Sequence, residues 1–156
     1  WGRPDMAYFK FTQSIINQKK IDVYNNGLMF RDFTYIDDVV NSVISCCIKP
    51  ATPDIDFDRS KPNPSTSFSP HRIFNVGNSN PVELLKFIEL LEIALGRKAI
   101  KLMKPMEKGD VRETFANTNL LEEWIGFQPK VSIEKGIVKF AKWYLDYYWD
   151  ESNKIN

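Results

Sequence analysis

A proline-rich stretch in the middle of the chain limits its possible folds more than any other feature. Residues 50–70 hold five prolines, several Ser, Thr, Asp and Asn residues, and little apolar periodicity. Such a segment is typical of an exposed loop, and it is longer than the loops of most compact domains. The helices and strands must therefore form on either side of it, as two lobes that need not be separate domains.

The patterned segments predict a mixed structure of the α/β or α+β class. Apolar spacing and capping residues favour helices over 5–19, 37–49, 84–95, 118–125 and 132–148. β-forming runs favour strands over 21–24, 28–36, 72–76, 100–103 and 114–116, with Asn25-Asn26-Gly27 joining the first two as a hairpin. We expect residues 1–150 to form one functional portion, with its Pro/Ser-rich loop at 50–71, and residues 151–156 to form a frayed tail.

Composition and charge exclude several classes of function. The chain has 156 residues, of which 21 are basic and 20 acidic, and it shows no basic cluster. This balance argues against nucleic-acid binding. No run approaches the ~18–20 apolar residues that cross a bilayer, and no signal peptide is evident at the start, so we expect a cytoplasmic protein that does not bind membranes.

The cysteines, the single histidine and the carboxylates do not form a recognisable catalytic or metal site. Cys46 and Cys47 are adjacent, without C-x-x-C spacing, and we interpret them as small apolar residues on a helix. His71 lies in the proline-rich stretch, a poor place for a preorganised base. No pair of His, Cys or carboxylate residues at i, i+4 spacing has a third ligand nearby, so we predict no metal.

The glycines are too widely spaced for a nucleotide-binding loop. They stand at 2, 27, 77, 96, 109, 126 and 136, so neither a dinucleotide fingerprint nor a phosphate loop can be written from them. The chain also starts with Trp1, and the turn and helix-start sequence that follows presupposes something before it. We therefore expect a piece of a longer protein that carries no Rossmann cofactor site of its own.

Several motifs together resemble the C-terminal half of extended short-chain dehydrogenase/reductase enzymes that act on nucleotide sugars. The resemblance is closest to UDP-glucuronate 4-epimerases of the capsular-polysaccharide type and covers nearly the whole chain. The motifs are Trp1–Ala7 (WGRPDMA), Ile21–Asn25 (IDVYN), Arg31–Asp38 (RDFTYIDD), Phe74–Asn78, Pro81–Leu84, Pro105-Met106, Gly109–Val111 and Trp143-Tyr144.

This resemblance implies that the chain is the substrate-recognition part of a Rossmann-type epimerase, with the Rossmann core largely absent. In that family an N-terminal half binds NAD and carries a Tyr-x-x-x-Lys pair, which does not occur here. The implied partners are a UDP-sugar substrate, the protein's own N-terminal half and, in the intact enzyme, a second copy in a homodimer. We expect the parent enzyme to interconvert UDP-glucuronate and UDP-galacturonate, and this chain alone to be inactive.

The resemblance also implies roles for individual residues. Arg31 resembles the arginine that holds the UDP diphosphate, for which a rigid guanidinium fork is well suited. The backbone amides of Met6 and Ala7 resemble a helix N-terminus that receives the same diphosphate. Asp110 resembles the acid that binds the uridine ribose. Tyr24 and Val82 correspond to positions that cover the uracil.

Arg3 is the position most informative about the sugar. In glucuronate epimerases the arginine of this motif lies near the sugar carboxylate, which needs a charge-assisted partner. Two residues depart from the family pattern, Glu107 and Lys108, and Arg112 is a candidate to replace a lost positive contact.

Structural interpretations of the same residues stay open. Arg31 can pair with Asp32 or Asp37, Asp110 can stabilise a turn, and Arg3 can be solvated. Met6, Tyr24 and Val82 can be ordinary core residues. We interpret the aromatic stripe of the last helix as a packing face; its members are Phe140, Trp143, Tyr144, Tyr147 and Tyr148.

Other functions remain possible from the sequence. They are another NAD-dependent UDP-sugar epimerase, dehydratase or decarboxylase on the same scaffold, and a non-catalytic nucleotide-sugar-binding or protein-interaction module. A separated C-terminal half would also expose the face that packs on its Rossmann half, which predicts self-association or poor solubility.

Overall fold

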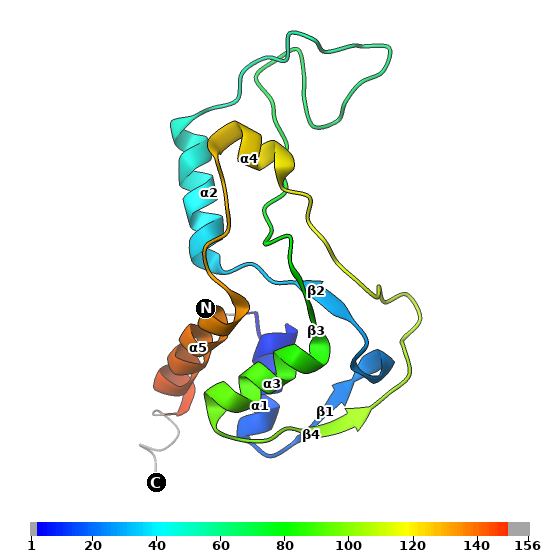
Figure 1. Cartoon of the computed structure of the whole chain (residues 1–156), viewed down its shortest axis with the longest axis vertical. Coiled ribbons are helices and arrows are strands. Elements are labelled where there is room, and N and C mark those ends of the chain that lie inside the picture. Colours follow the sequence, from blue (N-terminus) through cyan, green and yellow to red (C-terminus); the bar gives the residue numbers. More distant parts are fainter. Residues whose placement is uncertain (1–2, 150–156) are drawn as a thin grey trace. The chain divides into compact units, whose positions relative to one another are not determined.

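The structure, a computed structural model, describes residues 3–149 of the chain and falls into two compact units (Figure 1). Of the described residues, unit 1 contains 3–31, 81–114 and 132–149, and unit 2 contains 32–80 and 115–131. The proline-rich loop lies inside unit 2, so it does not separate two lobes as the sequence suggested. The predicted tail at 151–156 lies outside the described residues.

Unit 1 combines three helices with short strands. Its helices are α1 (Ala7–Ile16), α3 (Leu84–Leu95) and α5 (Ile133–Tyr144), and its strands are β1 (Lys20–Val23), β2 (Phe30–Asp32), β3 (Pro81–Glu83) and β4 (Ile100–Met103). A 3-10 turn, Tyr24–Gly27, follows β1, and a π-helical turn, Leu145–Trp149, follows α5. β1 pairs with β4 in parallel, from Lys20 opposite Ile100 to Val23 opposite Met103, and β2 lies beside β3.

The core of unit 1 forms where the apolar faces of these elements meet. α1 buries Phe9 and Ile16, α3 buries Ile88 and Leu91, and α5 buries Tyr144. Each of these side chains contributes about 1.5–3 kcal/mol by leaving water. Phe9 and Tyr144 meet edge to face with their ring centroids 5.1 Å apart, which confirms that the aromatic stripe of the last helix includes packing residues.

The helix ends follow the capping residues predicted from sequence. Gly96 adopts a left-handed conformation, with φ of 63°, at the end of α3. Gly126 does the same, with φ of 68°, at the end of α4 (Asn119–Ile125). The Ser132 side chain accepts a hydrogen bond from the Lys135 amide at the start of α5. These three predictions are confirmed.

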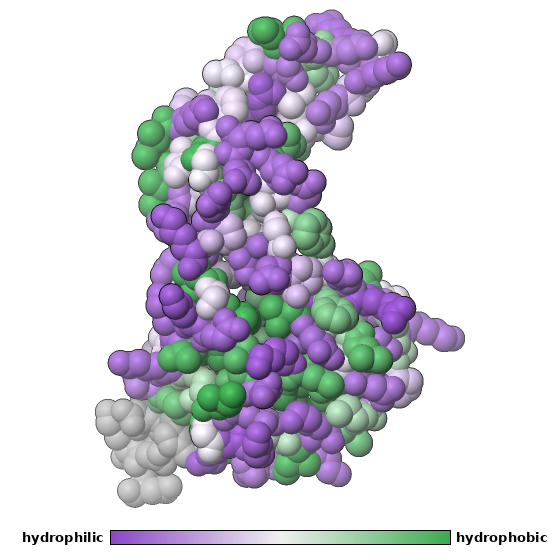
Figure 2. Space-filling model, viewed as in Figure 1, coloured by the Kyte–Doolittle hydropathy of each residue, from purple (hydrophilic) through white to green (hydrophobic). Residues whose placement is uncertain are grey.

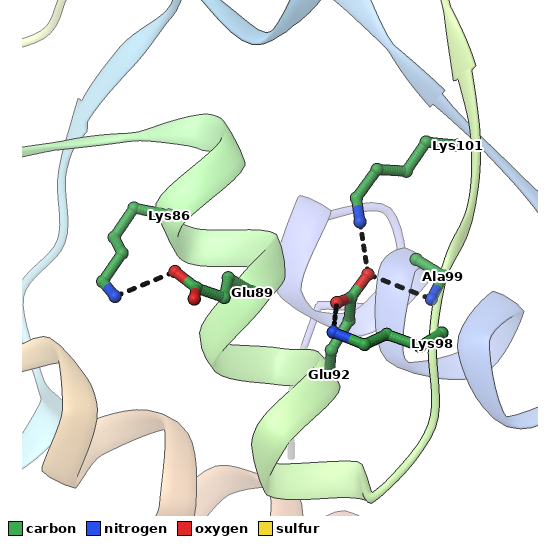
Figure 3. Close-up of polar contacts among 6 residues, drawn as sticks. All are labelled: Lys86, Glu89, Glu92, Lys98, Ala99 and Lys101. Atoms are coloured by element: carbon green, nitrogen blue, oxygen red, sulfur yellow. Dashed lines mark hydrogen bonds and ion pairs between the residues drawn. The ribbon is translucent and has the colours of Figure 1, made fainter.

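A buried carboxylate joins the end of α3 to the start of β4 (Figure 3). Glu92 has a side chain only 3% exposed. It accepts from Lys98 Nζ at 2.7 Å, from the Ala99 amide at 3.1 Å and from Lys101 Nζ. Burial opposes ionisation of Glu92, but these hydrogen bonds outweigh it and lower its pKa to about 2.

Unit 2 contains α2 (Ile36–Ile48), α4 and the proline-rich loop. The buried Asp38 carboxylate accepts from the amides of Lys130, at 3.2 Å, and Val131, at 3.0 Å. The Trp124 indole of α4 donates to the Lys49 carbonyl at the end of α2, at 3.1 Å. These polar contacts fasten α2 to α4 and to the segment that follows α4.

Asp32 holds a turn of unit 2 in place. Its carboxylate accepts from the Ser79 amide at 3.0 Å and from the Ala116 amide at 3.2 Å. Gly77 is required beside it, because a Cβ at this position would lie 2.3 Å from the Ala116 Cβ and 2.9 Å from Asp32 Oδ2. The first aspartate of the RDFTY motif is thus a structural residue.

The proline-rich segment is a loop, as predicted, and short-range hydrogen bonds organise it. Asp54, Asp58 and Asn63 each accept from the amide two residues further on, at 2.8–3.1 Å. Such Asx turns explain the abundance of Asp and Asn between the prolines. A hydrogen-bonded bridge between Thr66 and Arg72 closes the end of the loop.

The predicted hairpin is wrong. Asn25, Asn26 and Gly27 all adopt positive φ, as expected for these residue types. Three such residues in succession form a tight turn. Strand β1, however, pairs with β4 and not with β2. The strand predicted over 28–36 shrinks to Phe30–Asp32.

Two further predicted strands are absent from the described chain. Residues 72–76 form no ladder beyond the Arg72 bridge, and 114–116 is replaced by an isolated bridge between Phe30 and Glu113.

The described part of the chain has no helix long and apolar enough to cross a membrane. Its residues also hold no group of three or more potential metal ligands. Cys46 and Cys47 are free thiols on α2, as expected.

The Glu92 cluster predicts a specific dependence of stability on pH. The pKa of Glu92 is about 2 in the folded protein and ordinarily 4.5, so its contribution is complete above pH 4.5 and is lost as pH falls toward 2. That shift corresponds to about 3 kcal/mol. We expect Glu92→Gln to lower the free energy of unfolding at pH 7 by about 2 kcal/mol, as measured by urea denaturation.

Glu89→Gln is the matched control, because Glu89 pairs with Lys86 on the exposed side of the same helix. It should change the free energy of unfolding by less than about 0.5 kcal/mol. Equal losses for the two variants at pH 7, or no difference between wild type and Glu92→Gln in the slope between pH 5 and 3, would contradict this assignment.

Candidate functional site

Arg31 and Asp110 form an ion pair in unit 1. Arg31 Nη2 lies 3.0 Å from Asp110 Oδ1, and the side chains are 27% and 37% exposed. Arg31 Nη1 donates to the carbonyls of Phe30, at 2.8 Å, and Arg112, at 3.3 Å. Two residues that the sequence singled out, 79 positions apart, are therefore brought into contact.

The contact arises because the segment around Asp110 lies along β2. The Phe30 amide donates to the Arg112 carbonyl at 2.8 Å, and the Thr114 amide donates to the Phe30 carbonyl at 3.2 Å. Gly109, with φ of 87°, makes the turn that precedes Asp110. Asp110 Oδ1 also accepts from the Val111 amide at 2.9 Å, so the turn-stabilising role considered for Asp110 is present alongside the ion pair.

This geometry leaves Arg31 able to bind an anion. Three of its five N–H donors have protein acceptors, while Nε and one Nη2 hydrogen have none among the described residues. The guanidinium is held in place, partly exposed, with donors to spare. Those are the properties needed for charge-assisted hydrogen bonds to phosphate oxygens.

Arg112 contributes its backbone to this arrangement. Its carbonyl accepts from both the amide of Phe30 and the guanidinium of Arg31. Its side chain is exposed and forms no ion pair with the described residues. Arg112 is thus placed beside Arg31, and its charge is available to solvent.

Tyr24 lies directly after the carboxyl end of β1, next to Lys104, which follows the carboxyl end of β4. Lys104 Nζ lies 5.8 Å from the Tyr24 ring centroid and 2.9 Å from Asp22 Oδ2. The hydrogen bond that Lys104 donates to the Asp22 carboxylate raises the pKa of Lys104. Ligands of open parallel sheets bind at this end of the strands.

Sequence reasoning missed Asp22 and Lys104. Their signal was present, because opposite charges stand near the ends of two segments that were both predicted as strands. The predicted hairpin paired β1 with the wrong strand, which hid the contact.

Among the described residues, no hydrogen bond or ion pair joins the side chains of Arg3, Met6, Tyr24 or Val82 to the Arg31–Asp110 pair. Val82 is half-buried in β3, the strand beside β2. Arg3 pairs with Asp5 at 2.9 Å, with both side chains mostly exposed, and this contact lowers the pKa of the Asp5 carboxyl. The solvated interpretation of Arg3 therefore fits this structure.

The start of α1 offers one of the two predicted amides. The Met6 N–H donates to the Arg3 carbonyl at 3.1 Å. The Ala7 N–H has no acceptor among the described residues, and no side chain caps the helix. The Met6 side chain is 41% exposed, so it is not a core residue.

The described residues do not fit an NAD site. A dinucleotide fold needs a glycine-rich turn between a strand and the helix that follows it. α3 follows β3 directly, and α2 follows β2 through Phe33-Thr34-Tyr35, so neither junction contains a glycine. NAD would have to bind outside the described residues.

The sequence of the chain is similar to those of several known proteins. Protein CapI of Staphylococcus aureus is 47% identical over 148 residues, which cover 95% of this chain and 44% of that protein. A probable UDP-glucuronate 4-epimerase of Rhizobium meliloti is also 47% identical over 148 residues, covering 92% of this chain and 42% of its own length. No protein-family model matches the chain.

Among solved structures, the UDP-glucuronic acid 4-epimerase of Bacillus cereus in complex with UDP-glucuronic acid and NAD superposes with a TM-score of 0.73. It is 22% identical, and the match covers 94% of this chain and 41% of the epimerase. The fold is thus that of part of a Rossmann-type epimerase or dehydratase.

In sequence, the chain corresponds to the C-terminal half of UDP-glucuronate 4-epimerases. It spans less than half the length of the curated relatives that it matches.

The role of Arg31 in holding the segment around Asp110 can be tested directly. Arg31→Lys cannot keep all three contacts of the guanidinium fork. We expect the amides of Phe30 and Thr114 to exchange hydrogen about tenfold faster, while the free energy of unfolding changes by less than about 1 kcal/mol. Hydrogen exchange measured by NMR reports the first effect, and urea denaturation reports the second.

Arg112→Lys serves as the control because Arg112 contributes only its carbonyl. Faster exchange in Arg112→Lys and unchanged exchange in Arg31→Lys would refute the assignment.

Proposed function

We propose that this chain is the substrate-recognition part of an NAD-dependent UDP-glucuronate 4-epimerase, which interconverts UDP-glucuronate and UDP-galacturonate. The remaining, N-terminal part of such an enzyme would bind NAD and supply the catalytic residues. The observation that carries the proposal is the 47% identity, over 148 residues, to a probable UDP-glucuronate 4-epimerase.

Arg31 is the proposed ligand of the UDP diphosphate. Its Nε–H and free Nη2 hydrogen would bind phosphate oxygens while Asp110 and the two carbonyls keep the fork in place. The free Ala7 amide at the start of α1 supports anion binding at the same diphosphate, and the exposed Arg112 adds positive charge. Asp110 Oδ2 remains available as an acceptor for the ribose hydroxyls.

Tyr24 and Val82 are proposed to cover the uracil. Both side chains are half-buried, so each offers a surface on which a base can stack or pack. Lys104 supports the Tyr24 ring from one side. Arg3 is proposed to bind the sugar carboxylate. Its guanidinium would then leave the Asp5 carboxylate and pair with the carboxylate of the substrate.

Two substitutions separate recognition of the nucleotide from recognition of the sugar. Arg31→Ala should weaken binding of UDP, UDP-glucose and UDP-glucuronate alike, by about 10–100-fold, because it removes a charged hydrogen-bond donor to phosphate. Arg3→Ala should weaken UDP-glucuronate by about tenfold and leave UDP-glucose unchanged. Isothermal titration of the full chain measures both.

Arg59→Ala, which removes a positive charge from the proline-rich loop, is the control for net charge. Equal losses on UDP-glucose and UDP-glucuronate for Arg3→Ala would contradict the carboxylate role. Wild-type affinity of Arg31→Ala for UDP would contradict the diphosphate role.

The chain is expected to have no epimerase activity by itself. Its described residues do not fit NAD, and the sequence has no Tyr-x-x-x-Lys pair. Incubation with NAD and UDP-glucuronate should therefore give no UDP-galacturonate above a protein-free blank, as measured by anion-exchange chromatography. Turnover that scales with the concentration of the chain would contradict this division of roles.

A further inference from the structure

Lys104 joins the carboxyl ends of β1 and β4 through its backbone, and its side chain makes a separate contact. The Lys104 amide donates to the Val23 carbonyl at 3.0 Å, which continues the ladder. The Lys104 carbonyl accepts from the Asn26 amide at 3.1 Å, which ties the 3-10 turn to the end of β4. The ammonium group lies 2.9 Å from Asp22 Oδ2. Because the backbone is fastened without the side chain, the ion pair has another purpose.

Asp22 and Tyr24 lie on the same side of the chain. Strand β1 alternates, with Ile21 and Val23 buried in the core and Asp22 half-buried on the other side. Val23 is extended, with φ of −112° and ψ of 91°, so the alternation reaches Tyr24. Lys104 Nζ, which pairs with Asp22, also lies 5.8 Å from the centroid of the Tyr24 ring. One ammonium group thus lies beside both a carboxylate and an aromatic ring.

The backbone that follows Tyr24 is held in place, which leaves the orientation of the ring to be fixed. Asn25 Nδ2 donates to the Leu28 carbonyl at 2.8 Å, and the Leu28 amide donates to the Asn25 carbonyl at 2.9 Å. Gly27 lies so close to Leu85 that a Cβ would be 2.4 Å from Leu85 Cγ. The turn therefore has little freedom, and what remains to be restricted is the rotation of the Tyr24 side chain.

The charges around Lys104 favour an effect on the ring over an effect on phosphate. An ammonium group within about 6 Å of an aromatic centroid is attracted to the ring, and Lys104 meets this condition. Asp22 balances its charge, so the pair carries no net charge with which to draw phosphate from a distance. Figure 2 shows hydrophobic and hydrophilic side chains next to one another where β1 and β4 lie in the same view of Figure 1. This side of the ladder is thus not a uniformly charged face.

We propose that Lys104, fastened by Asp22, is a positioning residue for nucleobase recognition, which holds the Tyr24 ring in the orientation on which a pyrimidine base packs. The inference deepens the proposed function and rests on it, because it takes the base to be the uracil of a UDP-sugar. A side chain that is ordered before its ligand arrives loses less entropy on binding. Lys104 acts through Tyr24 and not on the ligand itself.

The expected effect is modest because the pair is partly exposed. The Lys104 and Asp22 side chains are 36% and 42% exposed, so solvent screens their attraction. A cation–ring contact at such a site, together with the ordering of one side chain, corresponds to about threefold to fivefold in affinity. Loss of a phosphate ligand such as Arg31 is expected to cost more, about 10–100-fold.

The first measurement is made by NMR on the full chain without ligand. The ring signals of Tyr24, in a chain with ¹³C-labelled tyrosine, are assigned with Tyr24→Phe. Lys104→Met, which removes the charge and keeps a long side chain, should shift these signals and increase the mobility of the ring. Lys104→Arg, which keeps the charge, should restore them. Lys20→Met, at the opposite end of β1, is the control and should leave them unchanged.

Titration with UDP and with inorganic pyrophosphate, followed by NMR so that weak binding is measurable, separates the base from the phosphates. Lys104→Met and Asp22→Asn should each weaken UDP by about threefold to fivefold and change the affinity for pyrophosphate by less than about twofold. Lys104→Arg and Lys20→Met should stay within about twofold of the wild type on both ligands. In a chain that carries Tyr24→Leu, Lys104→Met should cause no further loss, because the ring through which it acts is gone.

Tyr24 ring signals that do not respond to Lys104→Met overturn the proposal. Equal losses on UDP and pyrophosphate also overturn it, because they would place Lys104 on the phosphates. A loss of undiminished size in the Tyr24→Leu chain contradicts it as well, because Lys104 would then act without the ring. Failure of the proposed function is distinguishable: a wild-type chain that binds no UDP refutes nucleotide recognition, while the ring signals of the free chain still decide whether Lys104 positions Tyr24.

Discussion

The parallel ladder between β1 and β4 is the interaction on which unit 1 depends. It joins Lys20–Val23 to Ile100–Met103, about eighty residues later in the chain. Ile21 and Val23 are buried, and α1 packs on this strand. The buried Glu92 cluster fixes the point at which the chain leaves α3 and enters β4. Parallel pairing places the carboxyl ends of β1 and β4 side by side, so that Tyr24 and Lys104 come into contact. The segment that carries Asp110 begins at the carboxyl end of β4.

The helices were predictable because their signals are local. α3 and α4 end at the predicted glycines, and α5 begins at the predicted Ser132 cap. The Arg31–Asp110 contact was foreseeable only from the resemblance, since no periodicity links residues 79 positions apart. Arg31, Asp110 and Arg112 do come together, whereas Arg3 and Met6 make only local contacts.

The strands were poorly predictable because a strand is defined by its partner. Asn25-Asn26-Gly27 has the residues of a hairpin turn, and its backbone adopts positive φ, but the β1 ladder goes to β4. Residues 72–76 have strand-forming sequence, but within the described chain they form no ladder beyond the bridge between Arg72 and Thr66. The unconfirmed strand and the exposed apolar side chains of α2 both lie in unit 2.

The two units of the chain present different features. Unit 1 presents a held guanidinium with free donors, next to a carboxylate, which suits recognition of a nucleotide diphosphate. In unit 2, residues 72–76 form no ladder beyond the Arg72 bridge, and α2 exposes apolar side chains. Within residues 3–149, neither unit contains the glycine-rich junction that an NAD site requires.

The most direct test of the central claim is an NMR titration of the isotopically labelled chain with UDP, with the Arg31 guanidinium and backbone amides observed. Saturable shifts are expected at Arg31, at residues 109–112 and at Ala7, together with loss or reorganisation of the Arg31–Asp110 contact as phosphate binds. Saturation that leaves these signals unmoved, or an absence of any saturable shift, would contradict the claim that this chain recognises the nucleotide.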